Sequence, residues 1–268
     1  MANALIGYRN RIDAAVLSSG SWSASLPLAN LQSTIIGKVA RSSSPLNSAT
    51  KFDMDLGAAR AIRIVGLAGH NLSLAANYRI RGATDAGFAS VVSDSGWLAA
   101  WPSGFDPEAV AEFSWTLSYS LSVSVSARYW RIEIDDTTNS AGYVEIGRAF
   151  IGDAWQPTTN MSVGASIGWE ETTAIQTALS GAEYFSHVPV FRVARFSTTN
   201  MPEAQALGMA SEIQRISGVS GEVFFMWDPD DTAYAPQLGF LGRLRTLSAI
   251  EAPRYAAWDG AWEIKERL

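Results

Sequence analysis

A run of alternating serine and apolar residues, within residues 113–134, constrains the fold of this chain more than any other feature. Single serines separate the apolar residues Leu117, Tyr119, Leu121, Val123 and Val125. A period of two is that of a β-strand with one buried face, whereas a helix would scatter the serines into its core. Solvated strands more often carry Lys, Glu or Arg, so small neutral hydroxyls suit a face that is lightly packed or meets another protein surface. We therefore expect a β-rich protein that contacts other molecules.

The composition excludes several classes of protein. The chain has 268 residues, enough for one large or two ordinary domains, and we expect two. Its net charge is -6 and its 20 Lys and Arg residues are scattered, which argues against nucleic-acid recognition. The absence of cysteine excludes disulfides, thiolate catalysis and thiolate metal sites.

No signal for export or membrane insertion is found. Arg9 and Arg11 interrupt the N-terminal stretch where a secretory signal needs an apolar run. No apolar run approaches the roughly 20 residues that span a bilayer. We expect a protein that is made in a cytoplasm and stays there or leaves only by lysis.

The first part of the chain has the pattern of short strands separated by turns. Besides the serine-rich strand, strands are predicted at residues 52–56, 61–68, 77–82, 129–135 and 143–151. Residues 83–112 are rich in small and turn-forming residues and are predicted to form long loops. Many short strands separated by turns predict a β-sandwich or barrel.

A change of composition near residues 152–157 predicts a boundary between a domain at residues 1–152 and a domain at residues 153–268. A turn is predicted at Gly181 and Ala182. Strands of the second domain are predicted at residues 162–170, 188–197, 221–227, 238–247 and 257–266. With one helix at residues 201–217, this domain is predicted to be a β-sandwich or barrel with a flanking helix.

The predicted helix carries signals at both ends. Asn200 is a candidate N-cap, Pro202 lies in the first turn, and Glu203 stands three residues after the cap, as in a capping box. Gly218 is expected to end the helix. Its buried face is predicted to carry Leu207, Ala210, Ile213 and Ile216.

Candidate catalytic residues are few. His70 and His187 lie in unrelated segments, and no nucleophile-elbow, P-loop or dinucleotide-binding motif is present. Asp53 and Asp55 share one face of a predicted strand, at a spacing that suits a paired-carboxylate site or a cation. The solvent face of an alternating strand explains them better. We therefore predict that the chain is not an enzyme and has no cofactor.

A second acidic cluster follows the predicted strand at residues 221–227. It consists of Asp228, Asp230 and Asp231. Hard cations need about six oxygen ligands, and this loop offers only part of such a shell. A Pro-Asp turn is the default interpretation and calcium the alternative, so no metal site is predicted.

Three aromatic residues, Trp97, Trp101 and Phe105, lie in the loop-rich tract. Exposed rings in this tract could stack on the face of a sugar. They could instead plug the end of the sandwich, which the usual burial of Trp favours.

Two segments of the first part resemble discoidin-type, galactose-binding-like jelly rolls. KFDMDLGAARAIRIVGL (residues 51–67) is similar to a strand-turn-strand region of that family, and ARYWRIEIDD (residues 127–136) resembles a late strand. PLANLQ followed by KVARSSS resembles the entry segment of phage versions. The resemblance covers residues 20–152 and implies a jelly-roll β-sandwich. Many such domains bind no sugar, and no sugar-binding residue is carried over.

The second part resembles tail-tip and distal tail proteins of long-tailed bacteriophages. The resemblance rests on GRAFIGDAWQP, FRVARFSTTNMPEAQAL, GEVFFMWDPDD and QLGFLGRL in that order, within residues 145–268. It implies a tail-tube-like fold and a virion structural protein near the baseplate. Its partners would be other tail and baseplate proteins and further copies of itself in a ring, for which a hexamer is one candidate.

Contacts in such a ring are expected at strand edges, on the helix and in the loop that follows residue 227. The candidate residues are Gln205, Glu212, Arg215, Asp228, Asp230, Asp231 and Tyr234. The jelly roll would project outward, to clamp neighbouring proteins or touch carbohydrate on the host surface. Two alternatives stay open: a carbohydrate-binding module that uses Trp97, Trp101 and Phe105, and a cell-wall hydrolase that uses Asp53 and Asp55.

Overall fold

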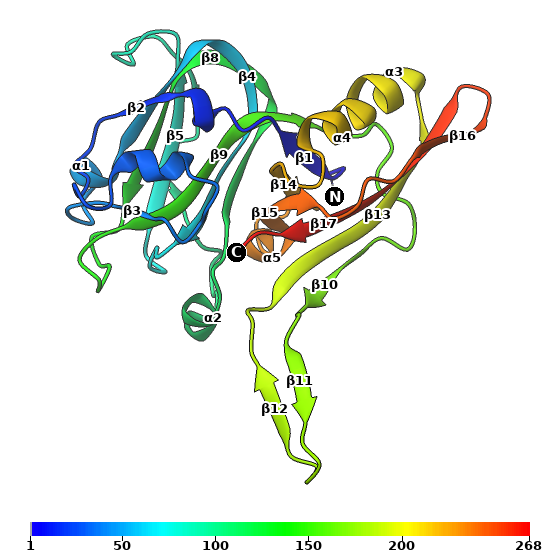
Figure 1. The fold of residues 1–268 in the computed structure, drawn as a ribbon. Helices are drawn as coiled ribbons and strands as arrows, with labels where there is room; N and C mark the ends of the chain where they lie inside the picture. The colour runs from blue at the N-terminus through cyan, green and yellow to red at the C-terminus, as the bar shows by residue number, and fades with distance from the viewer. Residues whose placement is uncertain (1) are drawn as a thin grey trace.

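Strands make up most of this protein, in two halves that lie side by side (Figure 1). The computed structural model describes residues 2–268, with 46% in strands and 14% in helices. The predicted fold class, mostly β with a helical segment flanking the C-terminal half, is confirmed.

The N-terminal half is a sandwich built on β4 and β8, two antiparallel strands of 19 residues each. Its strands are β2 (Val16–Ser18), β3 (Ala40–Arg41), β4 (Phe52–His70), β5 (Asn77–Ala83), β6 (Val91–Asp94), β7 (Leu98–Ala99), β8 (Leu117–Asp135) and β9 (Glu145–Trp155). Its helices are short: η1 (Ile12–Ala14), η2 (Leu28–Gln32), α1 (Asn47–Thr50) and α2 (Pro107–Glu112). The tract predicted as loops therefore contains two short strands and α2, which Asp106 caps by accepting a hydrogen bond from the Glu108 backbone N–H.

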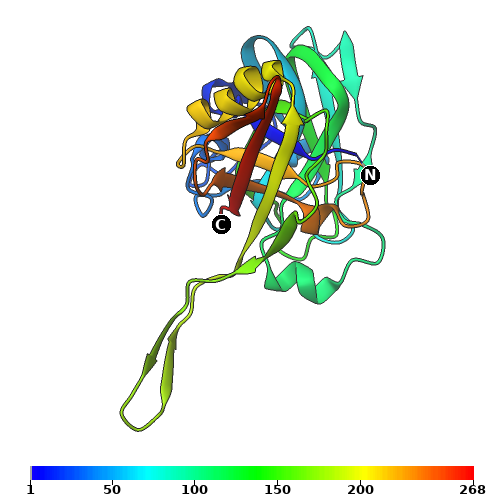
Figure 2. The same cartoon turned by 90° about the vertical axis from the view of Figure 1, so that its right-hand side faces the viewer.

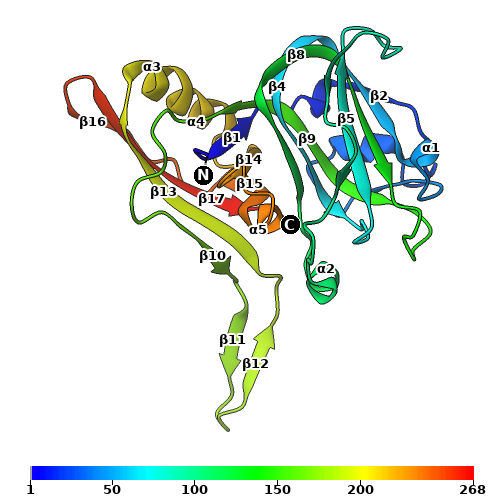
Figure 3. The same cartoon turned by 180° about the vertical axis from the view of Figure 1, so that it is seen from behind.

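The C-terminal half is a second, strongly curved part of the sheet with a helical segment packed against it, seen from behind in Figure 3. Its strands are β1 (Leu5–Tyr8), β10 (Ser166–Glu170), β13 (Phe191–Met201), β14 (Val223–Met226), β15 (Gly239–Leu244), β16 (Ile250–Arg254) and β17 (Ala257–Glu266). Its helical segments are α3 (Glu203–Gln205), the π-helical turn η3 (Ala206–Ala210), α4 (Ser211–Ser217) and α5 (Ala235–Leu238). A separate hairpin consists of β11 (Ala174–Thr177) and β12 (Glu183–Ser186).

One strand carries the sheet from one half into the other. The first part of β9 pairs with β4, up to Gly152 opposite Ile64, and its end pairs with β1, from Asp153 opposite Tyr8. β1 in turn pairs with β14 of the C-terminal half. The predicted boundary between residues 152 and 153 thus falls where β9 changes partners, and the division into two domains stays a prediction.

The serine-rich strand is β8, and its alternation is interrupted once. Leu117 is buried, whereas Tyr119, Leu121 and Val125 pack half-buried against the core of the N-terminal half. Val123 is 65% exposed, so the expectation that it is buried is wrong. The pairing of β8 with β4 shifts register there, and such an irregularity takes the extra residues out of the alternation.

The helical segment spans residues 203–217, close to the prediction, and Gly218 ends it with a φ of 51°. Asn200 is not its N-cap: it lies in β13 with a φ of 56° and its Oδ1 accepts a hydrogen bond from Arg254. Leu207 is exposed instead of buried. The π-helical turn adds a residue to one turn, which rotates the buried face onto Ala206, Ala210, Ile213 and Ser217.

A third hydrophobic cluster fills the junction between the halves. It is formed by Leu5, Ile36, Ile64, Ala68, Phe150, Ala154, Phe224, Met226 and Leu241. Beside it, the fully buried Arg148 of β9 forms an ion pair of 2.7 Å with Glu222 of the C-terminal half. The two halves therefore share both a core and a sheet.

Gly66 tests how tightly this junction is packed. A Cβ atom added at Gly66 would lie 2.0 Å from the ring of Phe224, so Gly66→Ala should lower the free energy of unfolding by about 1–3 kcal/mol through overpacking. Gly168→Ala is the control, because nothing lies within 4 Å of its added Cβ. Urea denaturation measures both, and equal stability of the two variants would contradict a close-packed junction.

Candidate functional site

The most exposed element is a hairpin that extends away from the body between β10 and β13 (Figures 1 and 2); residues 171–190 are called the arm below. Its strands β11 and β12 pair with each other in a two-stranded sheet of their own. The predicted turn at Gly181 and Ala182 is confirmed, with a φ of 84° at Gly181. All residues of the arm except Thr173 and Ala178 are exposed.

The surface of the arm is largely apolar. Ile175 and Phe185 are cross-strand neighbours, 59% and 48% exposed, and the Phe185 ring stacks on His187 at 5.7 Å. The other exposed large apolar residues are Leu179, Tyr184, Val188 and Val190. The arm contains two glutamates and neither Lys nor Arg. Its composition is therefore that of an interface more than of a solvated loop.

A buried ion pair fixes the base of the arm. Arg192 of β13 and Glu266 of β17 are almost fully buried, and the Arg192 Nε donates to Glu266 Oε2 at 2.9 Å. The guanidinium also donates to the carbonyl oxygens of Pro236, and of Gln237 and Gly239 at 3.2 Å each. The same side chain therefore ties the root of the arm to the α5 region.

Four aromatic rings surround the Arg192 guanidinium, with centroids 5.0 to 5.9 Å from its central carbon. Phe240 lies in β15 and Trp169 in β10, whereas Phe113 and Trp115 come from the N-terminal half. Cation–π contacts of this kind are strongest where water is excluded. The cluster joins both halves of the protein to the arm.

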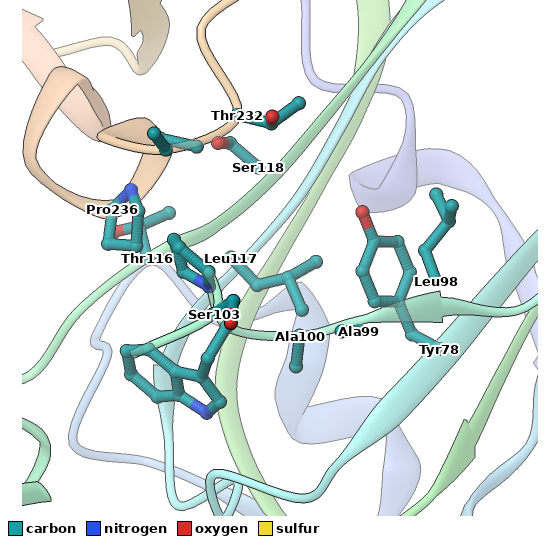
Figure 4. Close-up of a pocket in the computed structure, with 14 residues that line it drawn as sticks. Tyr78, Leu98, Ala99, Ala100, Ser103, Thr116, Leu117, Ser118, Thr232 and Pro236 are labelled. Carbon is teal, nitrogen blue, oxygen red and sulfur yellow. The ribbon is translucent and has the colours of Figure 1, made fainter. Parts of the chain in front are cut away.

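A cavity of about 450 Å³ lies between the two halves (Figure 4). Its walls come from β5, β7, the loop at residues 100–103 and the beginning of β8 on one side, and from residues 232–236 on the other. A second cavity of about 450 Å³ adjoins it and shares Pro102, Ser103 and Ala233. This composite position between two parts of a chain is typical of ligand sites.

The first cavity is uncharged and carries hydroxyl groups. None of its 14 lining residues is Asp, Glu, Lys, Arg or His. The hydroxyl-bearing side chains are Tyr78, Ser103, Thr116, Ser118 and Thr232. The Ser118 hydroxyl is buried without a hydrogen-bond partner among the described residues 2–268. Burial raises the pKa of Tyr78, with a smaller contribution from Tyr119, so its phenol stays neutral and can donate a hydrogen bond.

The three aromatic residues predicted as glycan contacts differ in exposure. Trp101 is 6% exposed, and its indole N–H donates to the Leu72 carbonyl oxygen at 3.3 Å. Its ring lies 5.0 Å from that of Phe105, which also contacts Trp115. Trp101 and Phe105 therefore pack as a plug, although each also lines one of the two cavities. Trp97 is 46% exposed, and glycan contact by the three residues stays a prediction.

The acidic residues are engaged within the chain. Arg131 and Arg128 of β8 hold the carboxylates of Asp53 and Asp55 through two hydrogen bonds each. The hydrogen bonds from Arg128 hold the pKa of Asp55 below its usual value. Both carboxylates are therefore engaged in ion pairs with the neighbouring strand.

The loop after β14 forms a turn through its own carboxylates. Asp228 accepts hydrogen bonds from the backbone N–H groups of Ala2 and Asp230, and Asp231 accepts from those of Ala233 and Tyr234. Within residues 2–268 no group of three or more potential metal ligands is clustered. The Asp231 backbone N–H donates to the Asp228 carbonyl oxygen at 3.2 Å, as in a turn, whereas the absence of a metal site stays a prediction.

The residues predicted as subunit contacts differ in availability. Gln205 accepts a hydrogen bond from the Thr158 backbone N–H, and Glu212 pairs with both Arg9 and Arg215. The side chains of Arg215 and Tyr234 remain largely exposed. As subunit contacts these residues stay a prediction.

In the described part of the chain, no helix has the length and apolar character needed to cross a membrane.

Comparisons with known proteins find low similarity to solved structures over part of the chain. The sequence matches no family model and no curated protein. The family 32 carbohydrate-binding module of C. perfringens NanJ, in complex with galactose, is similar at a TM-score of 0.41 and 13% identity, over 55% of this chain and 99% of that chain. The lectin domain of lectinolysin, complexed with Lewis b antigen, gives 0.39 and 14% over 53% and 95%. A fucose-binding module of Streptococcus pneumoniae gives 0.38 and 13% over 54% and 95%. No site residue is transferred from them.

The sequence reasoning missed the arm, the Arg192 anchor and the junction cavity. The sequence predicts only a turn at residues 181–182 and a strand that begins at residue 188 in this region. The lack of Lys and Arg from residue 171 to 190 is the one signal in the sequence that could have indicated an interface. Nothing local marks Arg192, because its partner Glu266 lies 74 positions away.

Substitution of Arg192 should lower the stability of the fold strongly. Arg192→Met leaves the buried Glu266 carboxylate without its counter-charge, with only the backbone N–H of residue 192 as a donor, and we expect the free energy of unfolding to fall by about 3–5 kcal/mol. Arg195→Met is the matched control, because its ion pairs with Glu170 and Glu263 are partly exposed and should be worth less than about 1 kcal/mol. Chemical denaturation compares them, and similar losses in both variants would show that Arg192 is not the anchor.

His70 should make stability depend on pH. Burial lowers its pKa from 6.5 to about 4. The unfolded chain therefore binds a proton that the folded chain refuses, and this residue should reduce stability by about 2 kcal/mol as the pH falls from about 7 to 5. In His70→Phe that share of the pH dependence should disappear. Urea denaturation at both pH values tests this. If the loss of stability between pH 7 and pH 5 is the same in His70→Phe as in the unaltered chain, the prediction is wrong.

Proposed function

We propose that this chain is a structural subunit of a protein assembly and that the arm docks it onto other subunits. The arm carries this proposal. A two-stranded hairpin on its own is at best marginally stable in water. Each large apolar side chain contributes about 1.5–3 kcal/mol only when it is covered. A neighbouring subunit would supply the cover that the chain itself does not give to Ile175, Leu179 and Phe185.

The anchor at Arg192 supports docking in a defined direction. One leg of the arm, residues 171–178, reaches roughly 26 Å if fully extended. Because the ion pair with Glu266 and the aromatic cluster hold its root, less freedom is lost when the arm docks. An arm on one side that fits a different surface of the next copy makes a head-to-tail contact, and such contacts generate rings where the rotation between copies closes.

In its finer form, the proposal places the chain in the virion of a long-tailed bacteriophage, at the distal tail or baseplate, after synthesis in the host cytoplasm. Its support is the sequence resemblance over residues 145–268 together with the arm. Further contacts with copies of the chain or with other tail proteins would come from Arg215 on the helical segment and Tyr234 in the loop. No catalytic step is part of the proposal.

Removal of the arm tests the proposal. In a variant with residues 173–188 replaced by a short Gly-Ser turn, the body should unfold at an unchanged temperature, because the arm lies outside all three hydrophobic clusters. Sedimentation velocity should show oligomers for the intact chain and monomers for this variant and for Phe185→Asp.

Val123→Asp is the control, since Val123 is 65% exposed, more than Phe185 at 48%, but lies on the body. It should leave the oligomers intact. The proposal is wrong if the intact chain stays monomeric over a wide concentration range and is also absent from phage particles purified from cells that express it.

Carbohydrate binding is the second candidate function. The specific observation in its favour is the uncharged cavity between the halves, with its five hydroxyl-bearing side chains and the Trp101 ring. Aromatic rings can pack against the apolar face of a sugar, and hydroxyl groups can donate hydrogen bonds to its hydroxyls and accept them. A host-surface glycan would be the ligand, and an array of immobilised glycans is the first test.

A further inference from the structure

We infer that the cavity between the halves is a composite site for an uncharged saccharide, completed by residues 232–236 of the C-terminal half. This inference rests on the second candidate function. It differs from the prediction made from the sequence, in which the loop aromatic residues of the jelly-roll half bind sugar without help.

The size and charge of the cavity limit its ligand. Its volume of about 450 Å³ lies within the range of about 300–1,000 Å³ that is usual for small-molecule sites. Its 14 lining residues are all uncharged. An ionic ligand would lose its hydration without gaining a counter-charge, which is strongly unfavourable. Acidic sugars, nucleotides and phosphates are therefore disfavoured.

The hydrogen-bonding groups favour a ligand with several hydroxyls. Each of the five hydroxyl-bearing side chains can both donate and accept, as a sugar hydroxyl can. The Ser118 Oγ is buried beneath the lining and does not count among these groups, which leaves Tyr78, Ser103, Thr116 and Thr232. Leu98 and the edge of Trp101 contribute apolar surface to the same lining.

The residues labelled in Figure 4 come from both halves of the protein. Tyr78, Leu98 and Thr116 belong to the sandwich, whereas Thr232 and Pro236 belong to the loop and helix that precede β15. Arg192 holds this second wall in place through the Pro236 carbonyl oxygen. The sandwich half without that wall would offer an open surface in place of a cavity.

The experiment titrates the full chain with galactose, fucose, glucose and N-acetylglucosamine and follows binding by saturation-transfer NMR and calorimetry. We expect saturable binding of at least one sugar. Ala233→Trp should fill the cavity and weaken binding more than tenfold. Thr116→Val, which removes one hydroxyl without a change of shape, should weaken it about five- to tenfold.

Ala111→Trp is the matched control, because Ala111 is exposed on α2 and lines neither cavity. It should bind as the unaltered chain does, and thermal unfolding verifies that every variant is folded. If a sugar binds but is lost only in Trp97→Ala, the composite site is wrong and carbohydrate binding stands. If none of the sugars binds at millimolar concentration, both the site and the second candidate function are wrong. Neither result touches the assembly proposal, which sedimentation tests.

Discussion

The ion pair between Arg192 and Glu266 is the interaction on which the other parts of the structure depend. A guanidinium removed from water is tolerated only where every donor is matched, and here a carboxylate, three carbonyl oxygens and four aromatic rings supply the match. These partners come from β17, the α5 region, β15, β10 and the N-terminal half. A single buried charge therefore positions the root of the arm and one wall of the junction cavity.

The two halves are held together more firmly than two domains on a linker. Domain interfaces within one chain are usually modest and polar, and they allow relative motion. Here β9 and β1 continue the sheet across the junction, and the ion pair between Arg148 and Glu222 also joins the two halves. A β-sandwich mounted in this way keeps a fixed orientation. That rigidity suits a subunit that must present several surfaces to different neighbours at once.

Features that depend on the local sequence pattern could be predicted from the sequence. Features that depend on contacts between residues far apart in the chain could not. The period of β8 and the end of the helical segment at Gly218 were readable, because both follow from backbone geometry. The exposure of Val123 depends on a register shift against β4, and that of Leu207 on a π-helical turn, and neither has a signal in the alternation itself. The cavity is less predictable still, since Tyr78 and Thr232 meet only after both halves have folded.

Arm docking and ligand binding should be energetically independent even though they share an anchor. Coupling between two sites needs an element with two arrangements of similar free energy that both ligands bias differently. The Arg192 side chain forms its hydrogen bonds to Glu266 and to the carbonyl oxygens in one conformation. Any other conformation would leave a buried charge without its partner. The anchor therefore fixes geometry without transmitting a signal. A subunit built in this way could hold a saccharide in its cavity without loosening the assembly that its arm maintains.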